Sequence, residues 1–431
     1  MKRQGILMIL IVFILTSCKS KSDEYVYTYV KLEDINSEDI QEIELEFELE
    51  GSPLFIEEMS DGYICATYKK SEKPNQDPIK LKQYYYTPII RKLDKNYKII
   101  WEKQFDGKGH VEALQVRDDD SFILTVDLQC RTVIGYDKDG NKLWSKIFND
   151  KPEVMLTDSG DIAVCENRYA YNDTFMTKID KNGNIVYSKA LDGSGTHCIA
   201  EYNGDIGILV QGYSNSTKSN LAGDKGENNF FVACINEKDF EVKWLYDSNK
   251  SYGTKKSIYM YDDKVYLTLR KQDNFLSKDE YWLVILDNNG KECGSMKYDP
   301  DSDFLDWGNC VTILDNKDII VGSSEIVYNG FLIIFDHNGK RKKIIKDLKY
   351  PLDTITPTDD GGFIVKSQRT IGNIPTPAVL STIWTDTEVV IVKYNSDYEV
   401  EWRKTYDKYK DSKLVDCIIP LRDGRVIVEA Q

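Results

Sequence analysis

Residues 132–148, reading TVIGYDKDGNKLWSKIF, determine how the rest of this chain is interpreted. An apolar run ending at Tyr136 leads to the pair Asp139-Gly140, and a second apolar run containing Trp144 follows. An Asp-Gly pair between two such runs is typical of a β-hairpin, because glycine readily adopts the positive φ angle that the tight turn needs. This stretch therefore predicts two antiparallel strands joined by a short turn.

The same pattern recurs along the chain. Residues 90–105 read IRKLDKNYKIIWEKQF and residues 177–191 read TKIDKNGNIVYSKAL, so that Asp94, Asp137 and Asp180 stand 43 residues apart. Weaker copies contain Asn236, Asp287, Asp336 and Asn395, which makes seven copies in all. In three copies the strand after the turn carries the pattern W-x-K-x-[FY], at residues 101–105, 144–148 and 402–406. This pattern is expected to be structural, with its Trp, Lys and aromatic side chains on one face.

A second element lies between these hairpins and occurs eight times. It is a short turn followed by an apolar strand, as in DGYICA from Asp61, GDIAVC from Gly160 and GRVIVE from Gly424. Each copy also has an apolar stretch before its turn, so the repeating unit contains four strands. A four-stranded unit with a period of about 40–50 residues is typical of one blade of a β-propeller.

The turn-and-strand element would form the inner two strands of each blade and occurs eight times. The hairpin would form the outer two strands and occurs seven times, so one outer pair is missing. Residues 25–31 (YVYTYVK) and 43–49 (IELEFEL) are expected to supply it. We therefore predict an all-β chain in which residues 25–431 form a single eight-bladed propeller of four-stranded blades, with seven blades as the alternative. Pairing of residues 25–50 with residues 415–429 would close the ring, and closure removes the bare sheet edges that invite aggregation.

The first residues resemble a bacterial lipoprotein leader. Lys2 and Arg3 precede an apolar run at residues 5–15 that is too short to span a bilayer, and LTSC at residues 15–18 resembles a lipobox. We expect residues 1–17 to be a signal peptide and Cys18 to carry the lipid, followed by a polar tether to residue 24. Export to the bacterial cell envelope and anchoring to a membrane would follow. The alternative is an ordinary signal peptide with a chance cysteine.

Composition narrows the classes of ligand. The formal net charge is −15 and no basic stripe occurs, so nucleic acid binding is not expected. The nine cysteines form no CxxC pair and no histidine cluster accompanies them, so no zinc site, other metal or cofactor is expected. Cys65, Cys165 and Cys234 lie within predicted strands and are expected to be small buried residues. The acidic stretch DPDSDFLD at residues 299–306 could hold Ca²⁺, although a solvated acidic loop is the simpler interpretation.

Candidate ligand-binding residues follow from loop length. The turns within the predicted hairpins are short, whereas the loops on the other face of the ring are long, and function tends to reside in long loops on a rigid scaffold. Aromatic side chains there suit glycans or extended peptides, while the alternative is that they pack their own loops. The residues expected to contact a ligand are Tyr84, Tyr85, Tyr86, His110, Tyr171, His197, Trp307 and Trp384.

YDKDGNKLWSKIF and IDKNGNIVYSKAL resemble repeats of the quinoprotein-like (PQQ-like) β-propeller superfamily. Members that bind pyrroloquinoline quinone carry a vicinal disulfide, and this chain has no adjacent cysteine pair. The superfamily also includes lipid-anchored, non-catalytic members. The sequence has three histidines, no Gly-rich phosphate loop and no nucleophile elbow, so we expect a monomeric lipoprotein that binds a protein or glycan without catalysis. The alternative is a glycan- or peptide-degrading enzyme that uses carboxylates such as Glu112, Asp353 and Asp416 near the mouth of the channel.

Overall fold

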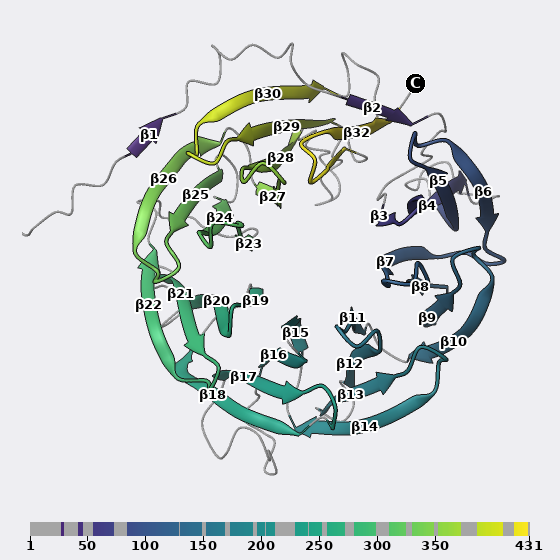
Figure 1. Cartoon of the computed structure of the whole chain (residues 1–431), viewed down its shortest axis with the longest axis horizontal. Coiled ribbons are helices and arrows are strands. Elements are labelled where there is room, and N and C mark those ends of the chain that lie inside the picture. Colours follow the sequence, from purple (N-terminus) through teal and green to yellow (C-terminus); the bar gives the residue numbers. More distant parts are fainter. Residues whose placement is uncertain are drawn as a thin grey trace, which may run out of the picture.

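In the computed structural model, strands are the regular elements of the described residues, and they surround a central axis as radial sheets (Figure 1). The structure describes residues 27–29, 42–45, 55–72, 84–128, 130–148, 152–168, 173–192, 196–202, 204–211, 229–239, 241–251, 257–271, 280–298, 310–324, 330–348, 352–371, 386–407 and 418–429. Within these ranges, no helix is long and apolar enough to cross a membrane.

Seven blades each contain four consecutive antiparallel strands, with the first strand innermost (Figure 1). The first three blades are β3 (Phe55–Met59), β4 (Gly62–Glu72), β5 (Tyr84–Asp94) and β6 (Ile99–Gln104); β7 (His110–Val116), β8 (Phe122–Asp127), β9 (Arg131–Tyr136) and β10 (Lys142–Phe148); and β11 (Glu153–Leu156), β12 (Ile162–Arg168), β13 (Asp173–Ile179) and β14 (Ile185–Asp192).

The next four blades repeat this plan. They are β15 (Thr196–Tyr202), β16 (Asp205–Gln211), β17 (Asn229–Asn236) and β18 (Val242–Ser251); β19 (Ser257–Tyr261), β20 (Lys264–Lys271), β21 (Glu280–Asp287) and β22 (Glu292–Tyr298); β23 (Cys310–Ile313), β24 (Ile319–Ser324), β25 (Gly330–Phe335) and β26 (Arg341–Leu348); and β27 (Leu352–Pro357), β28 (Phe363–Ile371), β29 (Asp386–Tyr394) and β30 (Val400–Asp407).

The predicted propeller fold with four-stranded blades is confirmed, but the main prediction of eight such blades is wrong. The described residues form seven, which was the alternative. Between the seventh and first blades lies a smaller closing sheet of three strands, β31 (Ile419–Pro420), β32 (Val426–Glu429) and β2 (Glu42–Leu45). In this sheet β2 pairs in parallel with β32, which joins the N-terminal part of the chain to its C-terminal part.

The N-terminal strands do not form the missing outer pair. β1 (Tyr27–Tyr29) instead pairs in parallel with the outer strand β26 of the sixth blade, as a fifth strand of that sheet. The sequence between β1 and β2 contains no glycine, whereas most of the outer hairpins turn through an Asp/Asn and a glycine. Without such a turn, the two segments pair separately as parallel edge strands.

Each outer hairpin is held by the aspartate or asparagine that the repeat predicted. In the second blade, Asp137 Oδ1 accepts hydrogen bonds from the backbone N–H of Asp139 at 3.0 Å and of Asn141 at 2.8 Å. Gly140 occupies the left-handed region with φ of 72° and donates its N–H to the Asp137 carbonyl at 3.0 Å. The repeated aspartate therefore sets the turn, because its carboxylate satisfies the backbone donors of the loop.

The repeated tryptophan joins the first, second and fourth blades to the blade that follows each of them. The Trp144 ring from β10 covers Gly183 of the following outer turn, and its indole N–H donates to the Lys181 carbonyl at 3.0 Å. The Trp101 ring covers Gly140 in the same way, and Lys103 Nζ donates to the Gly140 carbonyl at 2.5 Å. The predicted structural role of the W-x-K pattern is thus confirmed, and the contact lies between blades.

The core consists of apolar clusters between neighbouring blades. One cluster joins Ile64 and Ile90 of the first blade to Leu114 and Leu124 of the second. The side chains of Cys65, Cys165 and Cys234 are fully buried within strands, as predicted. The ring has two faces outside these clusters. The face with the short turns is called here the turn face, and the face with the longer connections is called the loop face.

Candidate functional site

Three rings meet at the loop-face end of the first and second blades. Tyr68 belongs to β4, Tyr86 to β5 and His110 to the start of β7. The ring centroids of Tyr86 and His110 are 4.5 Å apart, those of Tyr68 and His110 5.3 Å, and those of Tyr68 and Tyr86 4.8 Å. These distances lie in the range of favourable aromatic pairs, so the three side chains form one cluster, called here the ring cluster.

The local sequence explains why His110 reaches β5. The connection from β6 to β7 runs beside the first residues of β5. There Phe105 N–H donates to the Pro88 carbonyl at 3.0 Å and Gly109 N–H donates to the Tyr86 carbonyl at 2.6 Å. A Cβ on residue 109 would lie 1.7 Å from the Asp127 carbonyl oxygen, so only glycine allows this close approach. His110 comes directly after this glycine and is thereby held beside Tyr86.

A cation extends the ring cluster. The Lys108 ammonium lies 3.2 Å from the centroid of the Tyr85 ring. His110 is exposed, whereas Tyr68, Tyr85 and Tyr86 are half-buried. A partly desolvated set of rings with an exposed imidazole and an ammonium group offers both stacking area and hydrogen-bond donors, which is the surface that aromatic or polyhydroxylated ligands require.

Only some of the predicted ligand-binding residues lie near the ring cluster. Tyr85, Tyr86 and His110 lie in or beside the ring cluster, and Tyr84 belongs to the same strand, with its backbone opposite Glu72. His197 lies in β15 of the fourth blade. Tyr171, Trp307, Trp384 and the lipidation candidate Cys18 lie outside the described residues. The sequence analysis did not select Tyr68 or Lys108. For Lys108 the available signal is the close-approach glycine at 109.

The polar residues predicted at the channel mouth share a backbone feature. Glu112, His197 and Asp353 each sit where the register shifts between the two innermost strands of their own blade. Such bulges re-aim a side chain and are frequent beside functional sites. Glu112 is 3.8 Å from Arg131 and Asp353 is 2.9 Å from Lys366, so each carboxylate has a basic partner in its own blade. Asp416 and residues 299–306 lie outside the described residues.

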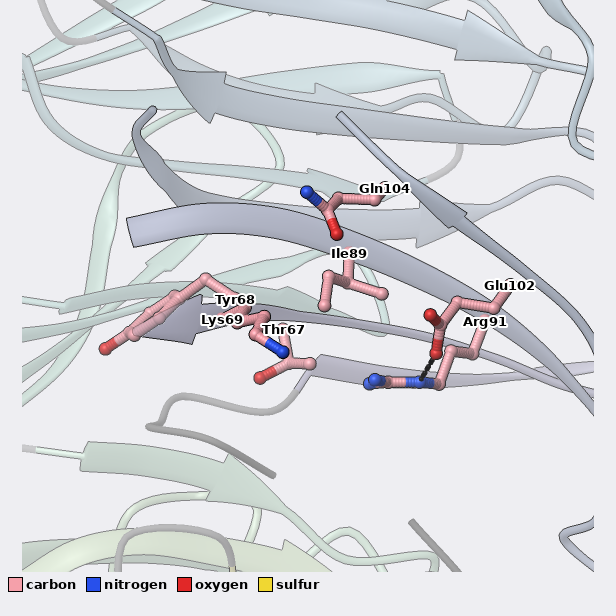
Figure 2. Close-up of a pocket in the computed structure, with 7 residues that line it drawn as sticks. All are labelled: Thr67, Tyr68, Lys69, Ile89, Arg91, Glu102 and Gln104. Carbon is pink, nitrogen blue, oxygen red and sulfur yellow. Dashed lines mark hydrogen bonds and ion pairs between the residues drawn. The ribbon is translucent and has the colours of Figure 1, made fainter. Parts of the chain in front are cut away.

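A cavity lies against the first blade and is lined by residues of β4, β5 and β6 (Figure 2). It has a volume of about 100 Å³, and its wall includes the ion pair from Arg91 Nε to Glu102 Oε2 at 2.6 Å. Burial raises the pKa of the neighbouring Cys65 thiol to about 12, although the Arg91 charge opposes this shift. The thiol is therefore protonated at neutral pH and unreactive. The volume is below the ~300 Å³ of typical small-molecule sites.

Comparisons with known proteins bear on the fold. No known family profile and no curated protein matches this chain. Among solved structures, the chain is similar to the C-terminal WD40 domain of Sif2, with a TM-score of 0.50 and 12% identity over 83% of this chain and 93% of that chain. It is also similar to BamB from Moraxella catarrhalis, with a TM-score of 0.48 and 11% identity over 82% and 87% of the two chains. A protein of unknown function from Bacteroides caccae gives a TM-score of 0.34 and 10% identity over 80% and 95%. At 12% identity the likeness to the WD40 domain supports the fold alone, and the two matches with TM-scores under 0.5 carry no argument.

Proposed function

We propose that this chain is a lipid-anchored lipoprotein of the bacterial cell envelope that acts as a non-catalytic binding module for a protein or glycan. The ring cluster of Tyr68, Tyr86 and His110 is the observation that carries the binding role. It gathers side chains from two blades at the end of the ring where the connections are longest. The Lys108–Tyr85 contact adds a charged donor beside the rings.

The anchoring half of the proposal rests on sequence. The positive residues Lys2 and Arg3, the apolar run and the LTSC motif occur in the order of a lipoprotein leader. Changing Cys18→Ser is expected to abolish lipid labelling and to release the protein from the membrane fraction. Persistent membrane association of that variant would contradict the anchor.

The binding half is tested with purified residues 25–431, screened against a glycan array and by pull-down from an envelope extract. For the ligand found, Tyr85→Ala and His110→Ala are expected to weaken binding by about tenfold or more, or at least ~1.4 kcal/mol, because His110 belongs to the ring cluster and Tyr85 holds the neighbouring Lys108. The melting temperature should change little, because His110 is exposed and Tyr85 is half-buried.

The matched controls lie on the turn face. Lys138 and Lys340 are exposed residues of the outer turns, and Lys138→Ala and Lys340→Ala should leave binding intact. The proposal assigns the ligand to the wrong face if these two changes abolish binding while the changes at Tyr85 and His110 do not. Breakdown of a bound glycan or peptide by the purified chain would instead support the enzymatic alternative.

A further inference from the structure

A row of exposed apolar side chains lies on the outer rim of the first four blades. Within the described residues, every exposed large hydrophobic side chain belongs to an outer strand, β6, β10, β14 or β18. They are Ile99, Ile100, Leu143, Ile147, Ile185, Val186 and Leu245. These four strands follow one another along the perimeter of the ring (Figure 1). Apolar side chains gathered on one part of a surface are typical of an interaction site.

Each of these strands also has an edge without a neighbouring strand. In the part of the chain that the structure describes, β6, β10, β14 and β18 each pair only with the third strand of their own blade. Their second edge presents backbone N–H and C=O groups that can pair with a further strand. Strand addition to such an edge is a common way of binding an extended segment, with main-chain hydrogen bonds for affinity and side chains for specificity.

The chain itself shows how an outer edge accepts a further strand. On the sixth blade, β1 lies outside β26 and pairs with it in parallel, so that residues 27–29 lie opposite residues 344–346 (Figure 1). In the closing sheet, β2 pairs in parallel with β32. Parallel addition of a short strand to a sheet edge is therefore a pairing that this fold already uses twice.

The equivalent segment of the second blade has no such strand within the described chain. Asp137 begins the outer turn of the second blade and Asp336 that of the sixth, and the same register shift follows both turns. Residues 344–346, which pair with β1, therefore correspond to residues 145–147 of β10. Ile147 in this segment is 69% exposed, the largest value among the exposed hydrophobic side chains. The edge of β10 thus offers the backbone that β26 uses for β1, together with an exposed apolar side chain.

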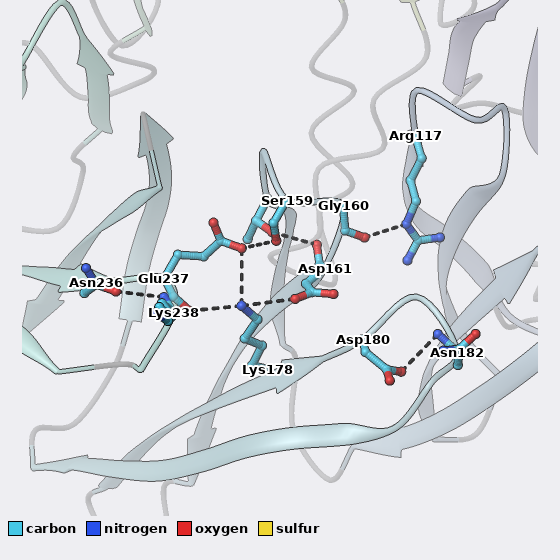
Figure 3. A network of polar contacts seen from close by, with 11 residues as sticks. Arg117, Ser159, Gly160, Asp161, Lys178, Asp180, Asn182, Asn236, Glu237 and Lys238 are labelled. Atoms are coloured by element: carbon cyan, nitrogen blue, oxygen red, sulfur yellow. Dashed lines mark hydrogen bonds and ion pairs between the residues drawn. The ribbon is translucent and has the colours of Figure 1, made fainter.

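Charge distinguishes β10 from the other three outer strands. β10 reads KLWSKIF and has two lysines and no acidic residue, whereas β6, β14 and β18 each contain one acidic residue. Among the described residues, Lys142 and Lys146 form no ion pair. The buried Lys178, by contrast, lies 3.0 Å from Asp161 and 3.4 Å from Glu237 (Figure 3). The two lysines of β10 can therefore pair with an acidic partner, although the whole chain has a net charge of −15.

The alternation along β10 defines the pattern of that partner. Ser145 and Ile147 are exposed, and they alternate with the less exposed Trp144, Lys146 and Phe148. Residues directly opposite in paired strands point to the same face. A partner strand with apolar residues beside Ile147 therefore places its alternate residues beside Lys146, where acidic side chains are favourable. A second copy of β10 would instead bring the lysines of both strands into one sheet, and like charges disfavour that pairing.

We propose that the outer edge of β10 binds an extended protein segment with alternating acidic and apolar residues, which adds in parallel as a fifth strand of the second blade. The site uses residues other than the ring cluster, so it is independent of the function proposed above. Residues 42–50 of the chain, EIELEFELE, have this alternating chemistry, and residues 42–45 of them form the added strand β2. This sequence therefore serves as the probe.

The test is calorimetric titration of the folded chain with the synthetic peptide EIELEFELE. It is expected to bind with a Kd below about 100 μM. A peptide in which lysine replaces every glutamate should bind at least about tenfold more weakly, because its lysines would meet Lys146. Two further peptides carry N-methyl groups on alternate backbone nitrogens. Only the set that faces β10 should abolish binding, since alternate N–H groups of a strand point to opposite edges. Undiminished binding of both N-methylated peptides would contradict strand addition.

A variant of the rim locates the binding. Ile147→Glu should weaken peptide binding by about tenfold or more, because it replaces an apolar contact with a charge that repels the acidic strand. The melting temperature should change little, since Ile147 is exposed. The matched control is Lys297→Glu, the same replacement at the equivalent position of β22 in the fifth blade, which should bind normally.

Three results would overturn the proposal. The first is absence of peptide binding, and the second is binding that persists in Ile147→Glu, which would place the peptide elsewhere. The third is attachment of the chain to vesicles of phosphatidylglycerol that Ile147→Glu abolishes, without any binding of the peptide. That result would assign the rim to a lipid surface.

Discussion

Three buried lysines occupy the same position near the end of the third strand of their blades. Lys92 is 2.8 Å from Asp61, Lys178 is 3.0 Å from Asp161, and Lys393 is 2.8 Å from Asp360. In each case the aspartate belongs to the inner turn of the same blade. The lysine ammonium is thus neutralised where the two turns of a blade meet, and the pair holds those turns together. A buried charge is tolerated because its partner compensates the lost hydration.

Asp360 is expected to make stability depend on pH. Burial alone would raise the pKa of its carboxyl, but hydrogen bonds from Lys393, Thr358 and Gly362 outweigh this effect and lower the pKa to about 2. The unfolded value is about 3.9, so the stabilisation is fully present above pH ~4 and is lost as the pH falls toward 2. Asp360→Asn should cost about 1 kcal/mol at pH 7, a figure discounted because the carboxylate is half-exposed.

Urea unfolding at pH 7 and at pH 3 checks this prediction. The difference in unfolding free energy between Asp360→Asn and the parent chain should shrink at the lower pH. Asp397→Asn, an exposed change in the neighbouring turn, should stay within about 0.5 kcal/mol at both pH values. A gap that widens at pH 3 would contradict the assigned direction of the pKa shift.

Among the elements, the outer turn of one blade can receive the tryptophan side chain of the preceding blade, and this contact site is called here the socket. Gly183 has φ of 83°, and a Cβ there would lie 2.3 Å from the Trp144 ring. Gly290 relates to Trp244 in the same way, with a separation of 2.4 Å. Glycine is therefore required twice at each socket, once for the backbone conformation and once for the space that the indole occupies.

Gly183→Ala should be more destabilising than an alanine placed at a matched glycine without a socket. Gly361 has φ of 81°, and the nearest atom to an added Cβ is Ser396 Cβ at 3.7 Å. Gly361→Ala is expected to cost about 1–2 kcal/mol from backbone strain alone. Gly183→Ala should add a further ~1–3 kcal/mol because the tryptophan must move. Chemical denaturation of both variants measures the difference, and equal costs would show that Trp144 is not held against the glycine.

At the scale of the whole molecule, the small closing sheet joins the two ends of the row of blades. Ile427 of β32 is fully buried and packs with Cys65, Leu93 and Tyr97 of the first blade. Its neighbours Val426 and Val428 point to the other face and pack with Trp402 of the seventh blade. One strand therefore contacts both sides of the seam.

Ile427→Ala is expected to weaken closure. Removing a buried isoleucine side chain costs about 2–5 kcal/mol. Because the loss is at the seam, hydrogen exchange measured by mass spectrometry should rise first in the first and seventh blades and less in the fourth. The control Ile147→Ala changes a side chain that is 69% exposed on an outer strand, and it should leave both stability and exchange close to those of the parent chain. Uniform exchange across all blades would argue against a seam that opens locally.

The repeating unit, the turns and the two unlike faces of the ring could all be predicted from the amino-acid sequence. Those features depend on residues close together in the chain, such as Asp137 with Gly140, whose backbone chemistry acts over one hairpin. The burial of Cys65, Cys165 and Cys234 could be predicted for the same reason, since alternation along a strand is local.

The number of complete blades and the contacts between distant side chains could not be predicted from the repeat, because they depend on tertiary packing. Counting strands could not distinguish an eighth outer antiparallel pair from the parallel pairing of β2 with β32, because parallel pairing carries no turn signal in the sequence. Tyr68, Tyr86 and His110 come together through the close approach of a crossing to β5. Arg117 meets Gly160 across a seam between blades. These contacts depend on how neighbouring blades pack, which no pattern within one repeat specifies.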